Sequence, residues 1–209
     1  MRGFLRFMLW ALGILGVIGL VLYLFVFDVW TVPGDDPAFT ASIAPNLHPG
    51  EHLLVLKSSE VKPGHLVRCV DPDAPARFVA ARIVAKGGDR VDVDEVVIVN
   101  GKRNPSPHAC AEGKLNMRHP ITQEDIVLDC AVEDTDGNEH DALRYPSHPE
   151  ATLKTTVEPG KVFLVSDDRH LHLDSRDYGQ LSPSSCQHIV YRLWGESYFD
   201  SAHRFNFLW

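Results

Sequence analysis

The sequence predicts a mainly β domain behind one N-terminal membrane-spanning helix. Residues 7–27, FMLWALGILGVIGLVLYLFVF, predict the helix, because they carry no charge and are long enough to cross a bilayer. The β domain is predicted by the short apolar stretches that follow, which are separated by turns rich in proline, glycine and aspartate. No later stretch shows a clear helical spacing of apolar residues, so strands are expected to form the core.

The charges that flank the apolar run predict its orientation. Arg2 and Arg6 precede it and Asp28 follows it, which by the positive-inside rule places the N-terminus in the cytoplasm. A cleavable signal peptide would have a shorter apolar core followed by a small-x-small site, and FDVWTVPGDD offers no such site. We therefore expect an uncleaved anchor in the cytoplasmic (inner) membrane over residues 1–30, and an extracytoplasmic domain over residues 31–209.

Alternation and turn signals place the strands of this domain. Residues 91–102, VDVDEVVIVNGK, alternate between apolar and polar and end in Asn100–Gly101, a dipeptide typical of a two-residue hairpin turn. Other apolar stretches are each bounded by turn residues. The further expected strands are 53–56, 66–70, 78–85, 162–165 and 189–194.

Residues 103–156 look different from the rest of the domain. They are rich in proline, histidine, aspartate, glutamate and asparagine, and they show little regular periodicity. We expect an inserted loop region with one or two strands, of which 126–132 is a candidate. The sequence assigns this segment no chemical role.

Composition excludes one class of partner and indicates a compartment. The 209 residues carry a formal net charge of −8 without a basic stripe, which argues against nucleic-acid binding. The four cysteines of an extracytoplasmic domain would meet oxidising conditions and allow three pairings. Cys110 and Cys130 bracket a polar region and are the favoured pair, whereas Cys69 and Cys186 lie in strand-like apolar stretches and are also compatible with buried thiols.

Four short motifs follow one another in a recognisable order. They read TASIAPNL at 40–47, KPGHLV at 62–67, ARIVAKGGD at 81–89 and FLVSDDRHLHLDSRDYG at 163–179. Together with the anchor they resemble the type I signal peptidases, membrane-anchored serine endopeptidases that remove signal peptides. The resemblance implies an antiparallel β-sheet catalytic domain, a translocated preprotein or peptide as substrate, the lipid bilayer as a second partner, and no cofactor.

The resemblance implies a nucleophile and an oxyanion hole. In the first motif Ser42 stands at the position of the family nucleophile, and Thr40 at that of a hydroxyl donor to the oxyanion. Donors placed in advance around a tetrahedral intermediate stabilise its negative oxygen, and here the Thr40 hydroxyl and the Ser42 N–H would be those donors. The plain alternative is that both are ordinary loop residues. Arg82, Asp167 and Arg176 match supporting positions of the family pattern.

The general base is where the sequence departs from the family. The family lysine falls at Ala81, and a serine hydroxyl is a weak nucleophile without a base. Lys86 is five residues on, so in a regular strand it points to the opposite face. His172 replaces a serine that in the family lies beside the lysine, and an imidazole titrates in a suitable range. Asp174 lies two residues further, on the same face of an expected strand, and could orient it. The hypothesis is a triad of Ser42, His172 and Asp174.

Three other interpretations apply to this region. Asp174 and Arg176 could form an ion pair with a purely structural role, and the chain could be an inactive relative that binds peptides at the membrane. A catalytic metal is the other possibility, because His170, His172 and Asp174 alternate as in some metallohydrolases. In that pattern a further histidine follows the aspartate, whereas here Ser175 follows it, so no metal is expected. The favoured function is cleavage of signal peptides or related segments through an acyl-enzyme.

Overall fold

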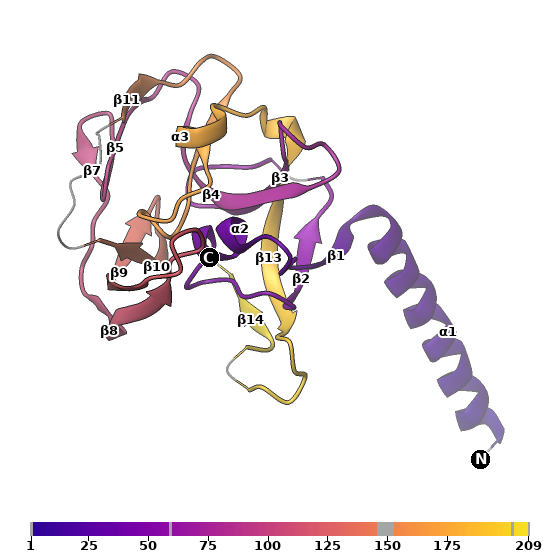
Figure 1. Cartoon of the computed structure of the whole chain (residues 1–209). Coiled ribbons are helices and arrows are strands. Elements are labelled where there is room, and N and C mark those ends of the chain that lie inside the picture. The colour runs from indigo at the N-terminus through magenta and orange to yellow at the C-terminus, as the bar shows by residue number, and fades with distance from the viewer. Residues whose placement is uncertain (1, 59, 146–152, 202, 209) are drawn as a thin grey trace.

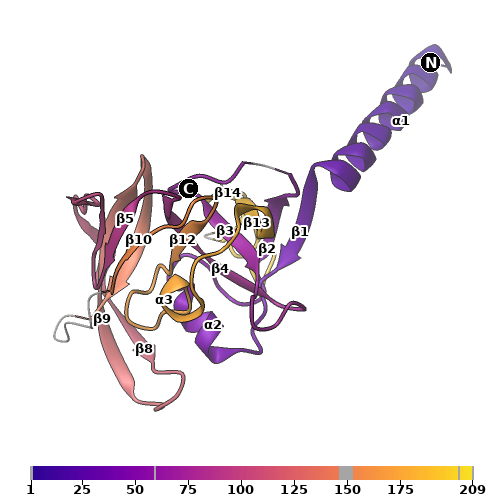
Figure 2. The ribbon, with the colours of Figure 1, turned by 90° about the horizontal axis from the view of Figure 1, so that it is seen from above.

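The structure is a computed structural model that describes residues 2–58, 60–145, 153–201 and 203–208. Helix α1 (Arg2–Phe25) projects away from a β domain in both views of the ribbon (Figures 1 and 2). Its apolar window has a mean hydropathy of 2.4 and none of that window is buried inside the fold. By length and composition, α1 is able to cross a membrane, as the sequence predicts.

The anchor is fastened to an edge strand of the domain. Strand β1 (Phe27–Thr31) follows α1 and pairs antiparallel with β2 (His52–Leu56). Just after β2, the Lys57 ammonium donates to Tyr23 O at 2.8 Å and to Leu24 O at 3.1 Å. These carbonyls belong to the last turn of α1, where the helix dipole favours a positive charge.

The largest sheet has seven strands in the order β1-β2-β13-β3-β4-β12, with β14 paired to β13. All its pairings are antiparallel, which confirms the mainly β, antiparallel prediction. The predicted strands at 53–56, 66–70 and 78–85 all lie in it. Its other strands are β3 (Leu66–Val70), β4 (Phe78–Lys86), β12 (Val162–Val165), β13 (Cys186–Trp194) and β14 (Asn206–Phe207).

A second sheet contains the predicted hairpin. Asn100 and Gly101 have φ values of 53° and 78°, as the two central residues of a type I′ turn require. They join β6 to β7, and the hairpin prediction is confirmed. The four strands, in the order β11-β5-β6-β7, are β11 (Leu153–Thr156), β5 (Arg90–Val93), β6 (Val97–Val99) and β7 (Lys102–Arg103).

The 103–156 segment is more regular than the sequence indicates. It forms a three-stranded sheet of β8 (Ala109–Arg118), β9 (Asp125–Thr135) and β10 (Asn138–Arg144), and it also supplies β11 to the second sheet. The expectation of one or two strands was too low. Most of β8 is exposed or half-buried, so its sequence lacks the apolar pattern that marks a strand packed on a core.

The four cysteines form two disulfide bonds. Cys110 joins Cys130 between β8 and β9, which is the favoured pair. Cys69 and Cys186 are buried, as expected, but they are bonded to each other and are not free thiols. They lie directly opposite each other on the neighbouring strands β3 and β13, a juxtaposition that only the sheet register reveals.

Two short helices lie on and near the main sheet. Helix α2 (Pro37–Ser42) packs its Phe39 into the same buried cluster as Trp30 and Ala80. Helix α3 (Ser175–Tyr178) follows β12 after an irregular loop. The two helices are six and four residues long, too short to produce a helical periodicity in the sequence. The first motif therefore begins on α2 and continues into the turn that follows it, and the fourth motif spans a strand, a loop and a helix.

Candidate active site

Helix α2 presents the two hydroxyl residues of the first motif. Asp36 caps its N-terminus, because its Oδ1 accepts from the N–H groups of Ala38 and Phe39, and proline occupies the first turn. The Thr40 hydroxyl donates to Asp36 O at 2.9 Å, and the Ser42 hydroxyl donates to Phe39 O at 2.8 Å. Both hydroxyls therefore donate to carbonyls of their own segment.

Ser42 is completely buried where α2 meets the loop after β12. The Asp168 N–H donates to Ser42 O at 3.2 Å and so joins the first motif to the fourth. Within the described ranges, the Ser42 hydroxyl bonds only to Phe39 O and makes no hydrogen bond to His172. The two predicted catalytic residues are thus not hydrogen-bonded to each other in this conformation, and their catalytic roles stay predictions.

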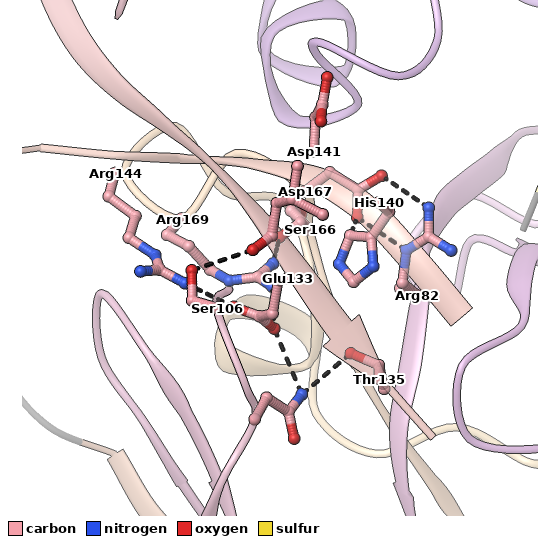
Figure 3. Close-up of polar contacts among 12 residues, drawn as sticks. Arg82, Ser106, Glu133, Thr135, His140, Asp141, Arg144, Ser166, Asp167 and Arg169 are labelled. Carbon is pink, nitrogen blue, oxygen red and sulfur yellow. Dashed lines mark hydrogen bonds and ion pairs between the residues drawn. The ribbon is translucent and has the colours of Figure 1, made fainter. Parts of the chain in front are cut away.

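Asn46 and Arg82 hold the fourth motif in place. Asn46 Nδ2 donates to Asp167 Oδ2 at 2.8 Å. Arg82 reaches both oxygens of the same carboxylate at 3.0 and 3.2 Å (Figure 3). Both Arg82 and Asp167 are buried. The structure therefore brings these two predicted supporting residues together in a bidentate ion pair.

The electrostatics of this pair favour the charged carboxylate. Burial raises the pKa of Asp167, but several neighbouring groups, Arg82 first among them, lower it, and the net effect is a pKa below its usual range. His140 lies beside the pair, with Nε2 3.7 Å from Asp167 Oδ1. Burial, aided by Arg82, lowers the pKa of His140 to about 3, so its ring is neutral at physiological pH.

A second buried carboxylate, that of Glu133, binds Arg169 of the same loop. Glu133 accepts from Arg169 Nη2 and from Arg144 Nη2, each at 2.8 Å, and from Asn104 Nδ2 at 3.2 Å (Figure 3). Burial raises the pKa of Glu133, but Arg169 first among several groups lowers it, and the net effect is a lowered pKa. Strand β9 of the insertion thus supports the same loop as Arg82 does.

The second motif contributes a tight turn to this frame. Arg82 Nη1 donates to Gly64 O at 3.3 Å. Gly64 has a φ of 87°, and a Cβ there would lie 2.4 Å from Thr135 O. Only glycine fits at such a position, because the turn packs directly on the end of β9.

His172 has a different carboxylate partner from the predicted one. Its Nδ1 lies 2.9 Å from Asp177 Oδ2, and the same oxygen accepts from the Asp174 N–H. Residues 170–174 form an irregular loop, so the expectation that His172 and Asp174 share a strand face was wrong. Burial lowers the pKa of His172, but the hydrogen bond to Asp177, with the nearby Asp174 charge, raises it above its usual value of 6.5.

Asp174 is engaged elsewhere. Arg176 donates Nε to its Oδ1 at 3.0 Å and Nη2 to its Oδ2 at 2.8 Å, and the Ser166 N–H donates to Oδ2 at 2.8 Å. Burial raises the pKa of Asp174, but the hydrogen bond and charge of Arg176, together with backbone N–H groups, lower it, and the net effect is a lowered pKa. The geometry therefore matches the ion-pair interpretation of Asp174 and Arg176, and it makes Asp177 the candidate that orients His172.

The family base position lies in the core. Ala81 is 2% exposed and packs in a cluster that includes Leu173 and Tyr178, the neighbours along the chain of His172 and Asp177. The pairing of β4 with β12 has a register shift that leaves Val84 without a partner residue on β12. Such a bulge can change the face of the sheet to which the later residues of β4, including Lys86, point. Lys86 is nevertheless exposed at the end of β4.

Asp168 is a residue whose importance sequence reasoning missed. Its side chain is fully buried, and its Oδ1 accepts from the N–H groups of His170 and Leu171 at 2.9 and 2.8 Å. Its Oδ2 has no hydrogen-bond partner among the described residues. Burial raises the pKa of Asp168 to about 7.

A groove runs beside α2 and offers space for a chain segment. Its volume is about 520 Å³, with Thr40 and Ala41 on one side and Leu115 and Met117 of β8 on another. Most of its lining is apolar or small. An extended peptide with small side chains fits such a surface, and Thr40 lies directly in its wall.

The histidine of the fourth motif also belongs to a group with metal-binding residue types. Donor atoms of His172, Asp174 and Asp177 lie within 4.8 Å of one another. Arg176 occupies both oxygens of Asp174, however, so a cation would compete with a guanidinium there. His172 and Asp177 alone fall short of the three protein ligands of a typical zinc site.

Comparison with known proteins agrees with the order of the motifs. The family model described as "Signal peptidase, peptidase S26" matches residues 4–190, from the anchor into β13. None of the curated proteins compared with the chain matches it.

Proposed function

The chain belongs to the signal peptidase family, and we propose that it is a membrane-anchored serine endopeptidase that cleaves signal peptides or related segments of translocated proteins. The observation that carries the proposal is the junction of the first and fourth motifs. There the Asp168 N–H donates a hydrogen bond to Ser42 O, beside a groove whose wall includes Thr40. A peptide in that groove would reach the serine from the side of α2.

In this proposal the Ser42 hydroxyl attacks the scissile carbonyl to form a tetrahedral intermediate. The hydroxyl must first leave Phe39 O, and its proton passes to the Nε2 of His172, since Nδ1 faces Asp177. The oxyanion accepts hydrogen bonds from the Ser42 N–H and from the Thr40 hydroxyl, which turns away from Asp36 O. The acyl-enzyme forms when the peptide C–N bond breaks and the protonated His172 gives its proton to the leaving amine. Water then hydrolyses the acyl-enzyme with the same histidine as base.

The proposal places the domain on the extracytoplasmic side. Two arginines precede the apolar run and an aspartate follows it, as the positive-inside rule requires for an internal N-terminus. Two disulfides among the four cysteines fit an oxidising compartment. The connection of β1 to α1 keeps the domain near the membrane surface, where translocated segments emerge.

The test uses the full chain in detergent and a preprotein that carries a signal peptide. We expect wild type to release the mature protein, and Ser42→Ala to lower cleavage by at least roughly 10³-fold. Ser184→Ala is the matched control, because Ser184 is an exposed serine just before β13 and outside the four motifs. His172→Ala should cause a comparable loss. A serine-reactive probe should label wild type and not the Ser42→Ala variant.

One observation favours a second function. Ser42 is buried and hydrogen-bonded to its own helix, and the family base position is Ala81. A chain that kept the groove and lost the base would bind peptides without cleaving them. If wild type is inert, if Ala81→Lys does not restore cleavage, and if the uncleaved preprotein still binds, this second function replaces the first.

A further inference from the structure

A cluster of possible metal ligands lies outside the candidate active site. Donor atoms of His48, Glu51 and His203 all lie within 4.8 Å of one another. His48 and Glu51 belong to the turn that follows the first motif, and His203 belongs to the C-terminal segment after β13. We propose that these three residues bind a zinc ion, which goes beyond the proposed peptidase function.

The turn that carries two of the ligands is fixed by backbone hydrogen bonds. The Gly50 N–H donates to Val32 O, and the Val32 N–H donates to Glu51 O, each at 2.9 Å. Within this turn His48 Nδ1 lies 3.4 Å from Glu51 Oε1. Two donors of a tetrahedral site with bonds of about 2.1 Å are separated by roughly 3.4 Å, so this pair already has the required spacing.

Glu51 supplies the strongest indication of a missing cation. It is 1% exposed, and within the described part of the chain neither of its oxygens has a hydrogen-bond partner. Arg192 Nε lies 3.0 Å from Oε1 and balances its charge, but it is not aligned for a hydrogen bond. Buried carboxylates are normally hydrogen-bonded or bound to a metal, so these oxygens are available to a cation.

His203 is held in the orientation of a metal ligand. Its Nδ1 lies 2.7 Å from Asp200 Oδ2, which leaves Nε2 as the ligand atom. Zinc-binding histidines usually have such a carboxylate on the other ring nitrogen. The ring centroids of His48 and His203 are 5.0 Å apart. Gly195 permits this approach, because a Cβ there would lie 3.0 Å from the His203 Cβ.

The ligand set indicates which metal binds. Two imidazoles and one carboxylate are typical of zinc sites that keep one position for water. The side chains of His48 and His203 are 50% and 37% exposed, so water and the ion have access from one side. The sequence offers no motif for this site, because its ligands come from opposite ends of the domain.

Zinc here would attach the C-terminal segment to the first motif. Strand β14 already folds the segment back onto β13, and His203 lies beyond residue 190, where the family match ends. His48 also lines the groove beside Thr40. The ion would therefore stabilise one end of that groove through a segment outside the matched region.

The experiment measures zinc binding to the full chain in detergent after treatment with a chelator. We expect wild type to bind one zinc ion per chain in competition with a chromophoric chelator. His48→Ala and His203→Ala should each abolish this binding, and Asp200→Asn should weaken it roughly 10–100-fold. His108→Ala, an exposed histidine outside the cluster, and His172→Ala should both bind zinc as wild type does.

A second variant guards against loss of binding through local unfolding. His203→Cys keeps a ligand at this position, so it should still bind one ion, and its cobalt complex should gain a thiolate-to-cobalt absorption that wild type lacks. The proposal is overturned if wild type binds no zinc, if His48→Ala and His203→Ala bind it normally, or if the cobalt complex of His203→Cys shows no thiolate absorption.

Discussion

Two parts of the candidate active site differ in how well their side chains are positioned. One part is the frame, the buried ion pairs that surround the site, and the other is the reactive part, the residues that would carry out the chemistry. In the frame, Asp167 pairs with Arg82, and Asp174 pairs with Arg176, each by two hydrogen bonds. In the reactive part, the Ser42 hydroxyl donates to a helix carbonyl. The charged frame is assembled without a substrate, whereas the nucleophile is not poised for attack.

This difference follows from what each part must do. A buried charge without a partner is costly at all times, so the folded state must satisfy it. A nucleophile and its base need to meet only when substrate is bound, and hydrogen bonds of catalytic groups often tighten only then. The buried ion pairs are therefore a feature of the fold. Activity depends in addition on a movement of Ser42 toward a base, which the ion pairs do not require.

The largest expected effect comes from breaking the frame. Arg82→Met keeps much of the side-chain volume but leaves the Asp167 carboxylate buried without its main partner. We expect a loss of about 3–5 kcal/mol in the free energy of unfolding, measured by urea denaturation of the full chain in detergent. Lys154→Met, which breaks the exposed pair of Lys154 with Asp92, should cost less than about 1 kcal/mol. Equal losses in the two variants would contradict a frame built on buried charge.

The next effect concerns the carboxyl group that lies between frame and nucleophile. In the unfolded chain Asp168 ionises near pH 3.8, whereas in the folded chain it keeps its proton to about pH 7. At this group the folded state binds more protons between these values, so the contribution of Asp168 to stability falls as pH rises from about 4 to about 7. A pKa that moves this far corresponds to about 4 kcal/mol as an upper bound.

Asp168→Asn removes this penalty. Its amide oxygen still accepts from the N–H groups of His170 and Leu171. We expect the variant to be more stable than wild type by about 2–4 kcal/mol at pH 8 and nearly equal to it at pH 4, measured by urea unfolding. Asp125→Asn, at an exposed position of β9, should show no such pH dependence. A constant difference between wild type and Asp168→Asn at both pH values would contradict the raised pKa.

Much of the frame could be predicted from the sequence, because it depends on local patterns. The apolar run predicts the anchor, Asn100–Gly101 predicts a hairpin, and the matched positions Arg82 and Asp167 prove to be partners. Each of these features is encoded in a few adjacent residues or in a motif. The β8–β10 sheet was only partly predicted, since strands with largely exposed faces lack apolar alternation.

The reactive part was harder to predict because it depends on how a loop closes. Asp174 and Asp177 are both near His172 in sequence, and only the capping of α3 decides that Asp177 turns toward the imidazole. The same limit applies to Glu51 and His203, which are brought together by strand pairing. To predict contacts between residues far apart in sequence, the register of the sheet must be known, and no motif in the chain specifies that register.

The smallest expected effect tests whether His172 serves the nucleophile as its base. A base must be neutral to accept the serine proton, and the pKa of His172 is raised, so cleavage should increase with pH through a midpoint above 6.5. Asp177→Asn keeps an oxygen acceptor for the α3 cap and removes the charge, so the midpoint should move to lower pH while cleavage at high pH falls about 10-fold. The measurement is kcat/KM across pH 5–9, with Asp92→Asn, at a half-buried position of β5 outside the candidate site, as the control. If the midpoint does not move in Asp177→Asn, the titrating group is not His172, and the serine must be activated by another residue.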